Sequence, residues 1–255
     1  MKKMQFLLLL ICTACLSVRT FAWGKRGHEI VAEIAFSMLD SNTRNNVQKY
    51  LDTTTIEQAS IWMDEMRSNP SYDYMKPWHY VNIEKGHQYL ETTEANIINT
   101  LNKAIYELGH KDTLTDKEIK TDLLLVFHLV GDLHMPLHIG YAADREGNDV
   151  RVMYDGKETS LHWLWDNDII EHYNITLNDC LAILASYNRK KTDSYKKINV
   201  IDWAIESRSF LDNVYDFKGD TIDQAYADKN KPVIEDQLVI AGIRLYAILD
   251  KSFRQ

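Results

Sequence analysis

The segment HLVGDLHMPLH, residues 128–138, contains three histidines and one aspartate within eleven residues. A second His-x-x-x-Asp pair follows at His162 and Asp166. Residues four apart lie one above the other on a helix, so His128 and Asp132 aim two donors at one point. Imidazole and carboxylate ligands together suit zinc, and two such pairs with further histidines exceed what one tetrahedral ion needs. The pattern therefore predicts a site for more than one metal ion.

The surroundings of the two pairs decide between metal binding and an ordinary surface contact. A single His-x-x-x-Asp pair on a helix is more often a hydrogen-bonded surface pair than a ligand set. Here an apolar run, residues 123–130, leads into the first pair, and Trp163 and Trp165 lie within the second. Polar groups without partners are costly in apolar surroundings. Metal binding is therefore the better interpretation of both pairs.

The spacing of apolar residues predicts a mostly helical chain. Only four prolines and ten glycines occur in 255 residues. Apolar residues recur with helical spacing at Ile30, Ile34 and Met38; at Ile97, Leu101, Ile105 and Leu108; and at Ile240, Ile243, Tyr246 and Leu249. Thr115 and Glu118 have the spacing of a capping box that begins the metal-binding helix, and Pro136 should end or bend that helix just before His138.

One stretch has the pattern of a β-hairpin. Apolar and polar residues alternate from Val150 to Tyr154, and the pair Asp155-Gly156, typical of a two-residue hairpin turn, follows directly. Nothing in the chain reads as a linker, a repeat or a low-complexity tract. We therefore expect an all-α fold, with a single compact multi-helix domain and a small β-hairpin near residues 148–160.

The first 22 residues have the pattern of a cleavable signal peptide. Lys2 and Lys3 precede an apolar run, residues 6–16, and Thr20 and Ala22 place small residues at the minus-three and minus-one positions of a cleavage site. The run is too short for a stable membrane anchor, and no later segment approaches the roughly 20 apolar residues that a span requires. We expect residues 1–22 to be removed and residues 23–255 to form an exported domain, periplasmic or secreted.

The cysteines leave one alternative open and limit what holds the domain together. Cys15 makes a lipoprotein the alternative, although the residues before it lack the usual leucine three positions upstream. Cleavage after Ala22 would leave Cys180 as the single thiol, so no internal disulfide could form. Stability must then come from core burial and from bound metal ions.

The charge of the chain argues against a basic nucleic-acid surface. Removal of residues 1–22 would delete three cations and no acid, which changes the formal net charge from −8 to −11. We interpret the basic clusters Arg189-Lys190-Lys191 and Lys196-Lys197 as solvated loop residues. Several divalent ions would nevertheless place strong positive charge in one cleft and attract phosphate to it.

Short motifs occur in one order along the chain and together resemble a known family. They are Trp23-Gly24, Gly27-His28, Trp62-Met63-Asp64-Glu65, Trp78-His79-Tyr80, the segment 128–138, Gly147-Asn148-Asp149, Leu161-His162-Trp163-Leu164-Trp165-Asp166, Trp203-Ala204-x-Glu206-Ser207 and Ala241-Gly242-x-Arg244-Leu245. This set resembles the trinuclear-zinc, single-strand-specific nucleases of the fungal and plant type, within the zinc phospholipase C superfamily. The resemblance runs from Trp23 to the C-terminal helix. The chain lacks the cysteines that cross-link fungal and plant relatives, which suggests a bacterial-type member.

The resemblance implies three zinc ions and nine ligand residues. Carried over position by position, it gives the first zinc to Asp64, His79, His128 and Asp132. The second zinc goes to His138, His162 and Asp166, with its remaining positions for water and the substrate phosphate. The third goes to His28, Asp132 and the α-amine and carbonyl oxygen of Trp23, so that Asp132 bridges two ions.

The same resemblance implies the reaction and its substrates. A pair of zinc ions lowers the pKa of a shared water, and a further ion can stabilise the departing oxygen of an in-line displacement. We therefore expect hydrolysis of phosphodiester bonds in single-stranded DNA and RNA to 5′-nucleotides, together with activity on 3′-nucleotides. We expect the protein to be a monomer with no stable membrane anchor.

Several further residues receive expected roles. Asp64 is placed to orient the attacking hydroxide as well as to bind metal, and Arg67 stands where relatives often carry a lysine beside the phosphate. The planar fork of arginine can hold two phosphate oxygens, so chemistry should survive this departure, although an exposed helix charge is the competing interpretation. His134 is expected to orient a ligand without binding metal.

Other aromatic and histidine residues carry weaker signals. Unpaired bases stack on aromatic side chains, and the candidates near ligands in the sequence are Tyr72, Tyr74, Tyr141 and Trp163. Most of these should be core or rim residues, with one or two free to stack a base. The histidines without a surrounding pattern, which we expect at the surface, are His87, His110 and His172.

Three alternative functions remain open at this point. A zinc phospholipase C shares most ligands but typically has glutamate at the last one, so Asp166 and the segment Gly147-Asn148-Asp149 favour a nuclease. A broad phosphomonoesterase activity is a second alternative. The third is a nonenzymatic zinc-binding protein, but structural zinc sites fill all four positions with protein ligands, whereas the second site here has only three.

Overall fold

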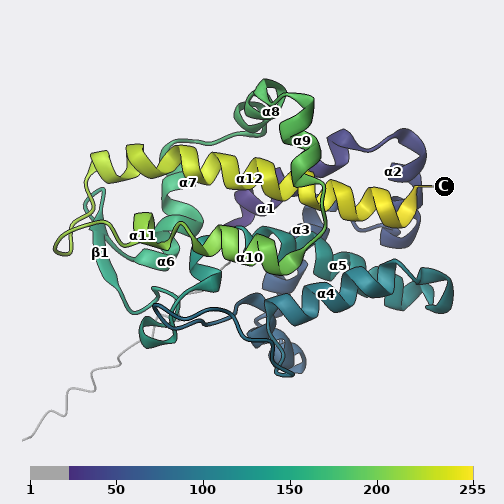
Figure 1. Ribbon diagram of the computed structural model, residues 1–255, viewed down its shortest axis with the longest axis horizontal. Helices are drawn as coiled ribbons and strands as arrows, with labels where there is room; N and C mark the ends of the chain where they lie inside the picture. Colours follow the sequence, from purple (N-terminus) through teal and green to yellow (C-terminus); the bar gives the residue numbers. More distant parts are fainter. Residues whose placement is uncertain (1–22, 255) are drawn as a thin grey trace, which may run out of the picture.

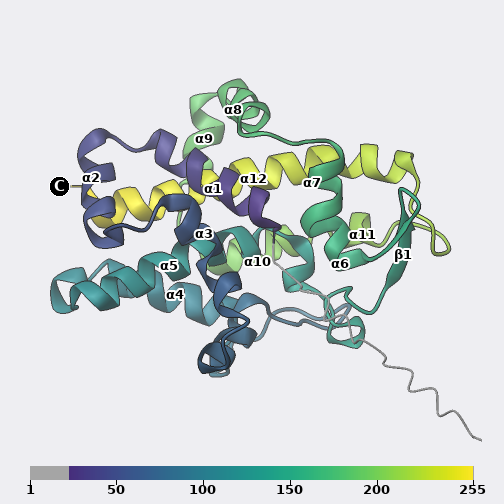
Figure 2. The same ribbon diagram turned by 180° about the vertical axis from the view of Figure 1, so that it is seen from behind.

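The long helix α12 (Gln224–Phe253) runs along the molecule, with other helices on both of its sides (Figure 1). The computed structural model describes residues 23–254. Residues 1–22, where the sequence predicts a signal peptide, lie outside the described residues. Seen from behind, α1 (Lys25–Met38) crosses α12, and α3 (Ile56–Met66) lies beside α1 (Figure 2).

Short helical turns connect the longer helices. The remaining helical elements are α2 (Ser41–Leu51), η1 (Pro70–His79), α4 (Ile97–Leu108), η2 (Lys111–Thr113), α5 (Asp116–Leu133), η3 (Pro136–Ile139), η4 (Ala142–Asp144), α6 (Leu161–Trp163), η5 (Leu164–Asp168), α7 (Ile169–His172), α8 (Leu177–Ser186), α9 (Arg189–Tyr195), α10 (Val200–Arg208) and α11 (Leu211–Val214). Of the η segments, η5 is a π-helical turn and the others are 3₁₀ turns.

Helix α5 is the central element because its second half is buried on every side. Every residue from Asp122 to Leu133 is buried. A helix that is apolar all round requires neighbours on all its faces, and α5 packs against α1, α3, α4 and α12. His128 and Asp132 are therefore held inside the core.

Helices α1 and α12 approach closely because Gly242 has no side chain. A Cβ atom at this position would lie 2.4 Å from Cγ2 of Ile34 and 2.6 Å from its Cβ. Any larger residue would therefore force the two helices apart. This contact brings the start of α1, which carries His28, against the core of the molecule.

The structure confirms the expected all-α domain and its helix signals. The three segments with helical spacing lie in α1, α4 and α12. The capping box is present at the start of α5, where Thr115 N donates to Glu118 Oε2 at 2.8 Å and Glu118 N donates to Thr115 Oγ1 at 3.3 Å. Helix α5 ends at Leu133, and Pro136 begins the separate turn η3.

The expected hairpin is also present. Strands β1 (Arg151–Tyr154) and β2 (Lys157–Ser160) pair in antiparallel register. Asp155 and Gly156 connect them with φ angles of 48° and 73°, the left-handed conformation that a tight hairpin turn requires. Within residues 23–254, no helix combines the length and the apolar character that a membrane span needs.

Helix α5 also buries a carboxyl group away from the predicted metal ligands, which gives the fold a predicted pH dependence. Burial, and then the charge of Glu107 on α4, raise the pKa of Asp122 to about 7. The folded-state pKa is thus above the unfolded value of about 3.9, so protonated Asp122 favours the folded state. This contribution is complete below about pH 4 and is lost as the pH rises through 7.

We predict that Asp122→Asn removes this loss of folding stability at high pH, because asparagine cannot ionise. Urea unfolding between pH 5 and 8 should show the variant more stable than the wild type at pH 8, by an amount of the order of 1–3 kcal/mol, with the difference shrinking at pH 5. Asp116→Asn, an exposed position on the same helix, is the matched control and should leave the slope unchanged. Parallel pH profiles for wild type and Asp122→Asn would contradict the prediction.

Candidate metal centre

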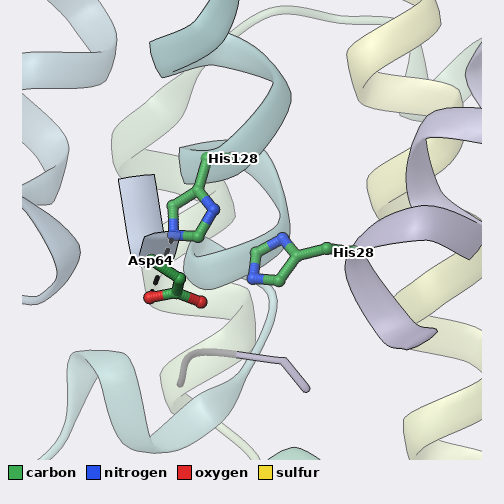
Figure 3. A group of neighbouring side chains, drawn as sticks. All are labelled: His28, Asp64 and His128. Carbon is green, nitrogen blue, oxygen red and sulfur yellow. Dashed lines mark ion pairs between the residues drawn. The ribbon is translucent and has the colours of Figure 1, made fainter. Parts of the chain in front are cut away.

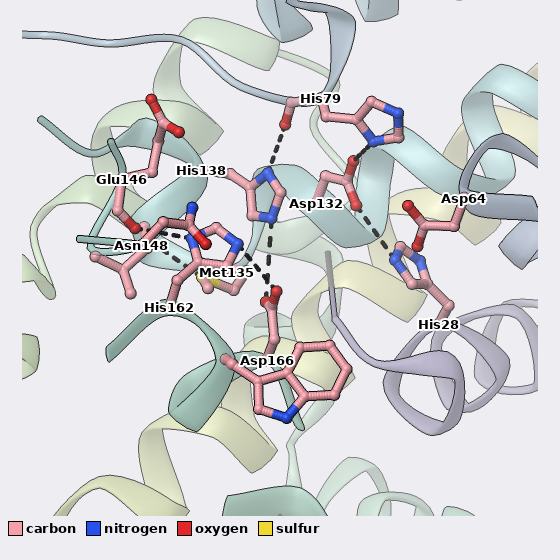
Figure 4. Close-up of polar contacts among 12 residues, drawn as sticks. His28, Asp64, His79, Asp132, Met135, His138, Glu146, Asn148, His162 and Asp166 are labelled. Carbon is pink, nitrogen blue, oxygen red and sulfur yellow. Dashed lines mark hydrogen bonds and ion pairs between the residues drawn. The ribbon is translucent and has the colours of Figure 1, made fainter. Parts of the chain in front are cut away.

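The buried carboxylate of Asp132 lies at the centre of three imidazole rings. Its Oδ1 is 3.2 Å from Nε2 of His28, and its Oδ2 is 2.9 Å from Nδ1 of His79 and 3.2 Å from Nε2 of His128. Figure 4 shows Asp132 between His79 and His28. The structure thus brings the residue expected to bridge two ions between members of both expected ligand sets.

His128 and Asp132 lie one turn apart on α5, and His28 reaches them from α1. Nδ1 of His128 donates to the carbonyl oxygen of Ser60 at 2.7 Å, which turns Nε2 toward Asp132. The ring of His28 stacks on that of His128, with centroids 4.2 Å apart. This approach requires Gly131, because a Cβ there would lie 2.7 Å from Nδ1 of His28.

Asp64 completes a group with His28 and His128. One potential ligand atom from each of these three residues lies within 4.8 Å of the others. Figure 3 shows the side chains converging from α3, α1 and α5. His79, His128 and Asp132 form a second such group. The two groups share His128, so Asp64 lies close to members of both the first and the third expected ligand sets.

His138, His162 and Asp166 form the third group. Nε2 of His162 is 3.0 Å from Oδ2 of Asp166, and Nε2 of His138 is 4.0 Å from its Oδ1. Asp166 lies in the π-helical turn η5, so the sequence expectation of an ordinary helical pair is corrected in this detail. A π turn widens the helix by one residue and occurs often at functional sites.

Main-chain carbonyl groups fix the rings of the third group. Nδ1 of His138 donates to the carbonyl oxygen of His79 at 2.6 Å, and Nδ1 of His162 donates to that of Glu146 at 2.8 Å. In both rings Nε2 is left to face Asp166. Such contacts orient a metal-binding histidine and set its tautomer.

The carbonyl that holds His162 belongs to a strained segment. Arg145, Glu146 and Gly147 all have positive φ angles, of 52°, 57° and 79°. Residues other than glycine rarely adopt this conformation, and strain of this kind gathers at functional sites. The segment presents the Glu146 carbonyl to His162, while the Glu146 carboxylate accepts a hydrogen bond from Asn82 at 2.6 Å.

Trp23 lies against the group of His138, His162 and Asp166, the residues expected to bind the second zinc. Its side chain is completely buried, and the amide of Gly24 donates to the carbonyl oxygen of Asp166 at 2.7 Å. This hydrogen bond places the backbone of Trp23 next to a ligand segment. Coordination through its α-amine and carbonyl oxygen stays a prediction.

The donor atoms of the centre fit divalent cations. Several are buried without a hydrogen-bond partner, among them Nε2 of His28, His79 and His138, Oδ1 of Asp132 and both carboxylate oxygens of Asp166. Buried polar atoms of native proteins nearly always have partners. Neighbouring pairs such as His28 and Asp132 approach to 3.2 Å without hydrogen-bond geometry. Atoms arranged in this way suit a shared cation.

The electrostatics of the cluster point in the same direction. Burial lowers the pKa of His79 to about 4 and raises that of Asp166 to about 7. Burial also lowers the pKa of His128, but the charges of Asp132 and then Asp64 outweigh it and raise the value to about 9. Burial thus opposes the carboxylate charges, and bound cations would compensate them.

Two of the predicted residues lie at the edge of the centre or behind it. Arg67 is partly exposed, and its Nη1 lies 3.4 Å from Oδ1 of Asp64. His134 is completely buried, but its ring nitrogens contact the carbonyl oxygen of Val130 and the guanidinium of Arg244. Its contacts therefore differ from the expected one, because neither partner is a predicted metal ligand.

The remaining candidates are distributed as follows. The three histidines expected at the surface, His87, His110 and His172, are exposed. Tyr72 stacks on Tyr74 with centroids 6.3 Å apart, in the segment between Asp64 and His79, and Tyr74 is 59% exposed. Tyr141 and Trp163 are half-buried. Tyr74 is therefore the most accessible of the four aromatic candidates.

Comparison with known proteins identifies the family. The model of the S1/P1 nucleases matches residues 23–254. The chain belongs to the S1/P1 nuclease family. Endonuclease 2 of Arabidopsis thaliana is 26% identical over an alignment that covers 91% of this chain and 90% of the relative. Nuclease S1 of Aspergillus oryzae is 26% identical over an alignment that covers 93% of this chain and 94% of the relative.

Membership of the S1/P1 nuclease family agrees with the geometry of the centre. The family supports a hydrolase that acts on phosphodiester bonds of nucleic acid. Within residues 23–254, three groups of buried histidine and aspartate residues are arranged so that each could hold a metal ion.

We predict that Gly131→Ala selectively weakens the metal group that contains His28. The added methyl group would displace the His28 ring from Asp132, so the protein should bind about one metal ion fewer per chain while the other two groups remain filled. Elemental analysis after gel filtration measures the ratio. Gly109→Ala, at a helix end with an ordinary φ of −68°, is the control. A full metal complement in Gly131→Ala would refute the role of this close approach.

Proposed function

We propose that this chain is an exported, zinc-dependent nuclease that hydrolyses single-stranded DNA and RNA to 5′-nucleotides and also acts on 3′-nucleotides. The observation that carries the proposal is the set of three adjoining ligand groups around Asp132 and Asp166. It is supported by the S1/P1 family match. Three zinc ions, bound by the nine residues Trp23, His28, Asp64, His79, His128, Asp132, His138, His162 and Asp166, are part of the proposal.

The side chains of the centre have different roles in the proposed reaction. Bound zinc ions would supply Lewis acidity to the phosphate and lower the pKa of a bound water. Asp64 orients the attacking water, and Arg67, whose guanidinium lies 3.4 Å from Asp64, holds phosphate oxygens through its planar fork. Asp132 keeps the histidines of two ligand groups at a fixed separation.

The preference for single strands follows from the burial of the ligands. His138 and Asp64 are only 3% and 6% exposed, and His128 and Asp166 are fully buried. A phosphate must therefore come below the level of the protein surface to reach these atoms, which an unpaired strand does more easily than a duplex. The exposed Tyr74, whose ring contacts that of Trp78 next to His79 in the sequence, gives an unstacked base an aromatic surface.

We predict that protein beginning at Trp23 cleaves single-stranded DNA at least tenfold faster than duplex DNA, and that a chelator abolishes both activities while lowering the melting temperature. Phosphatidylcholine and a 3′-nucleotide are tested in parallel to distinguish a phospholipase or a phosphomonoesterase.

Asp132→Asn should be inactive, whereas the exposed control His172→Asn should match the wild type. Equal rates on the two forms of DNA would refute the strand preference, and faster phospholipid cleavage would refute the nuclease assignment.

If Trp23 binds zinc through its α-amine, activity depends on removal of the expected signal peptide. A backbone amide nitrogen has no available lone pair for a metal, so zinc can bind at this nitrogen only after the signal peptide is removed. Protein with one additional alanine before Trp23 should bind about one zinc fewer per chain and be inactive or nearly so. The comparison uses elemental analysis and nuclease rate against protein that begins at Trp23. Normal zinc content and rate in the extended protein would exclude Trp23 as a ligand.

A further inference from the structure

Three residues that the proposed chemistry does not use meet in one network behind the metal centre, where His134 and Arg244 are buried and Glu206 is partly exposed. They are His134 from the turn after α5, Arg244 from α12 and Glu206 from α10. Nη1 of Arg244 contacts Nε2 of His134 at 2.6 Å, and Nη2 of Arg244 pairs with Oε2 of Glu206. His134 is fully buried and Arg244 is 4% exposed.

The chemistry of the side chains determines which atoms of the network donate hydrogen bonds and which accept them. A guanidinium can only donate hydrogen bonds, so Nε2 of His134 must be the acceptor. The proton of the neutral ring is therefore on Nδ1, which donates to the carbonyl oxygen of Val130 at 2.6 Å. The ring of Trp203 lies 5.2 Å from the Arg244 guanidinium, within cation–π range. His134 thus has one tautomer and one orientation.

The orientation of His134 affects the metal centre because His134 lies in the turn between Asp132 and His138. His134 caps the end of α5, two residues after Asp132, and begins the turn that leads to His138. Met135 N donates to the carbonyl oxygen of Asp132, and His138 N donates to that of Met135, both at 3.0 Å. Asp132 belongs to the group with His79 and His128. His138 belongs to the group with His162 and Asp166. The turn therefore determines how far apart the two groups lie.

We propose that Arg244, held by Glu206, is a positioning residue that acts through His134 to fix the separation of the two ligand groups. The proposal rests on the function proposed above only in taking these groups to bind zinc. A buried arginine is costly, and apolar residues of similar size often replace buried ion pairs without loss of stability. A role in stability alone would therefore not require this charge, whereas setting the orientation of His134 does.

The test measures zinc binding separately from catalysis. Arg244→Met keeps the length of the side chain and removes the donors. We expect it to remain folded, to bind zinc 10- to 100-fold more weakly and to change the absorption spectrum of the cobalt(II)-substituted protein. Its kcat should fall while KM stays close to that of the wild type. Glu235→Gln, which removes an ion pair with Lys231 elsewhere on α12, is the matched control and should leave all three properties unchanged.

A second pair of variants decides the matter if Arg244→Met does not fold. The side-chain oxygen of glutamine can still accept from Arg244, so His134→Gln should keep most of the zinc affinity, whereas His134→Leu should lose it. Unchanged zinc affinity and cobalt spectrum in a folded Arg244→Met, or equal affinity in the two His134 variants, would overturn the proposal. Because zinc binding is measured without substrate, a wild type that binds zinc but cleaves no nucleic acid would refute the proposed function and leave this inference intact.

Discussion

The carboxylate of Asp132, buried among the rings of His28, His79 and His128, is the constraint on which the rest of the structure depends. A buried negative charge is tolerated only where cations or strong donors surround it. The rings that supply them come from α1, η1 and α5, so three segments far apart in the sequence must meet at one point. The close contact at Gly131 and the apolar surface of α5 make this meeting possible.

Much of this arrangement could be predicted from the sequence because it depends on local patterns. The spacing of His128 and Asp132, the capping box at Thr115 and the hairpin turn at Asp155 each involve a few neighbouring residues. The order of the motifs then pointed to the S1/P1 family, which the family match confirms. Patterns of this kind survive in a single sequence because the backbone enforces them directly.

The rest could not be predicted because it depends on the main chain of distant segments. The carbonyl groups of Ser60, His79 and Glu146 orient three ligand rings, and a carbonyl group carries no signature in the sequence. The π turn that holds Asp166 differs from an α-helix by one residue, which periodicity over so short a stretch does not resolve. The partner of His134, Arg244, lies 110 residues away on another helix.

The distribution of the ligand groups along the chain has a further consequence. His28 and Asp132 meet across roughly a hundred residues, while the single described cysteine, Cys180, is free and buried. A metal ion that binds only the folded chain joins such distant segments, and its binding free energy adds to the stability of the folded state. Metal ions bound here would act as the cross-links of the domain. Such cross-links would respond to the supply of metal and to acid, and not to the redox state of the surroundings.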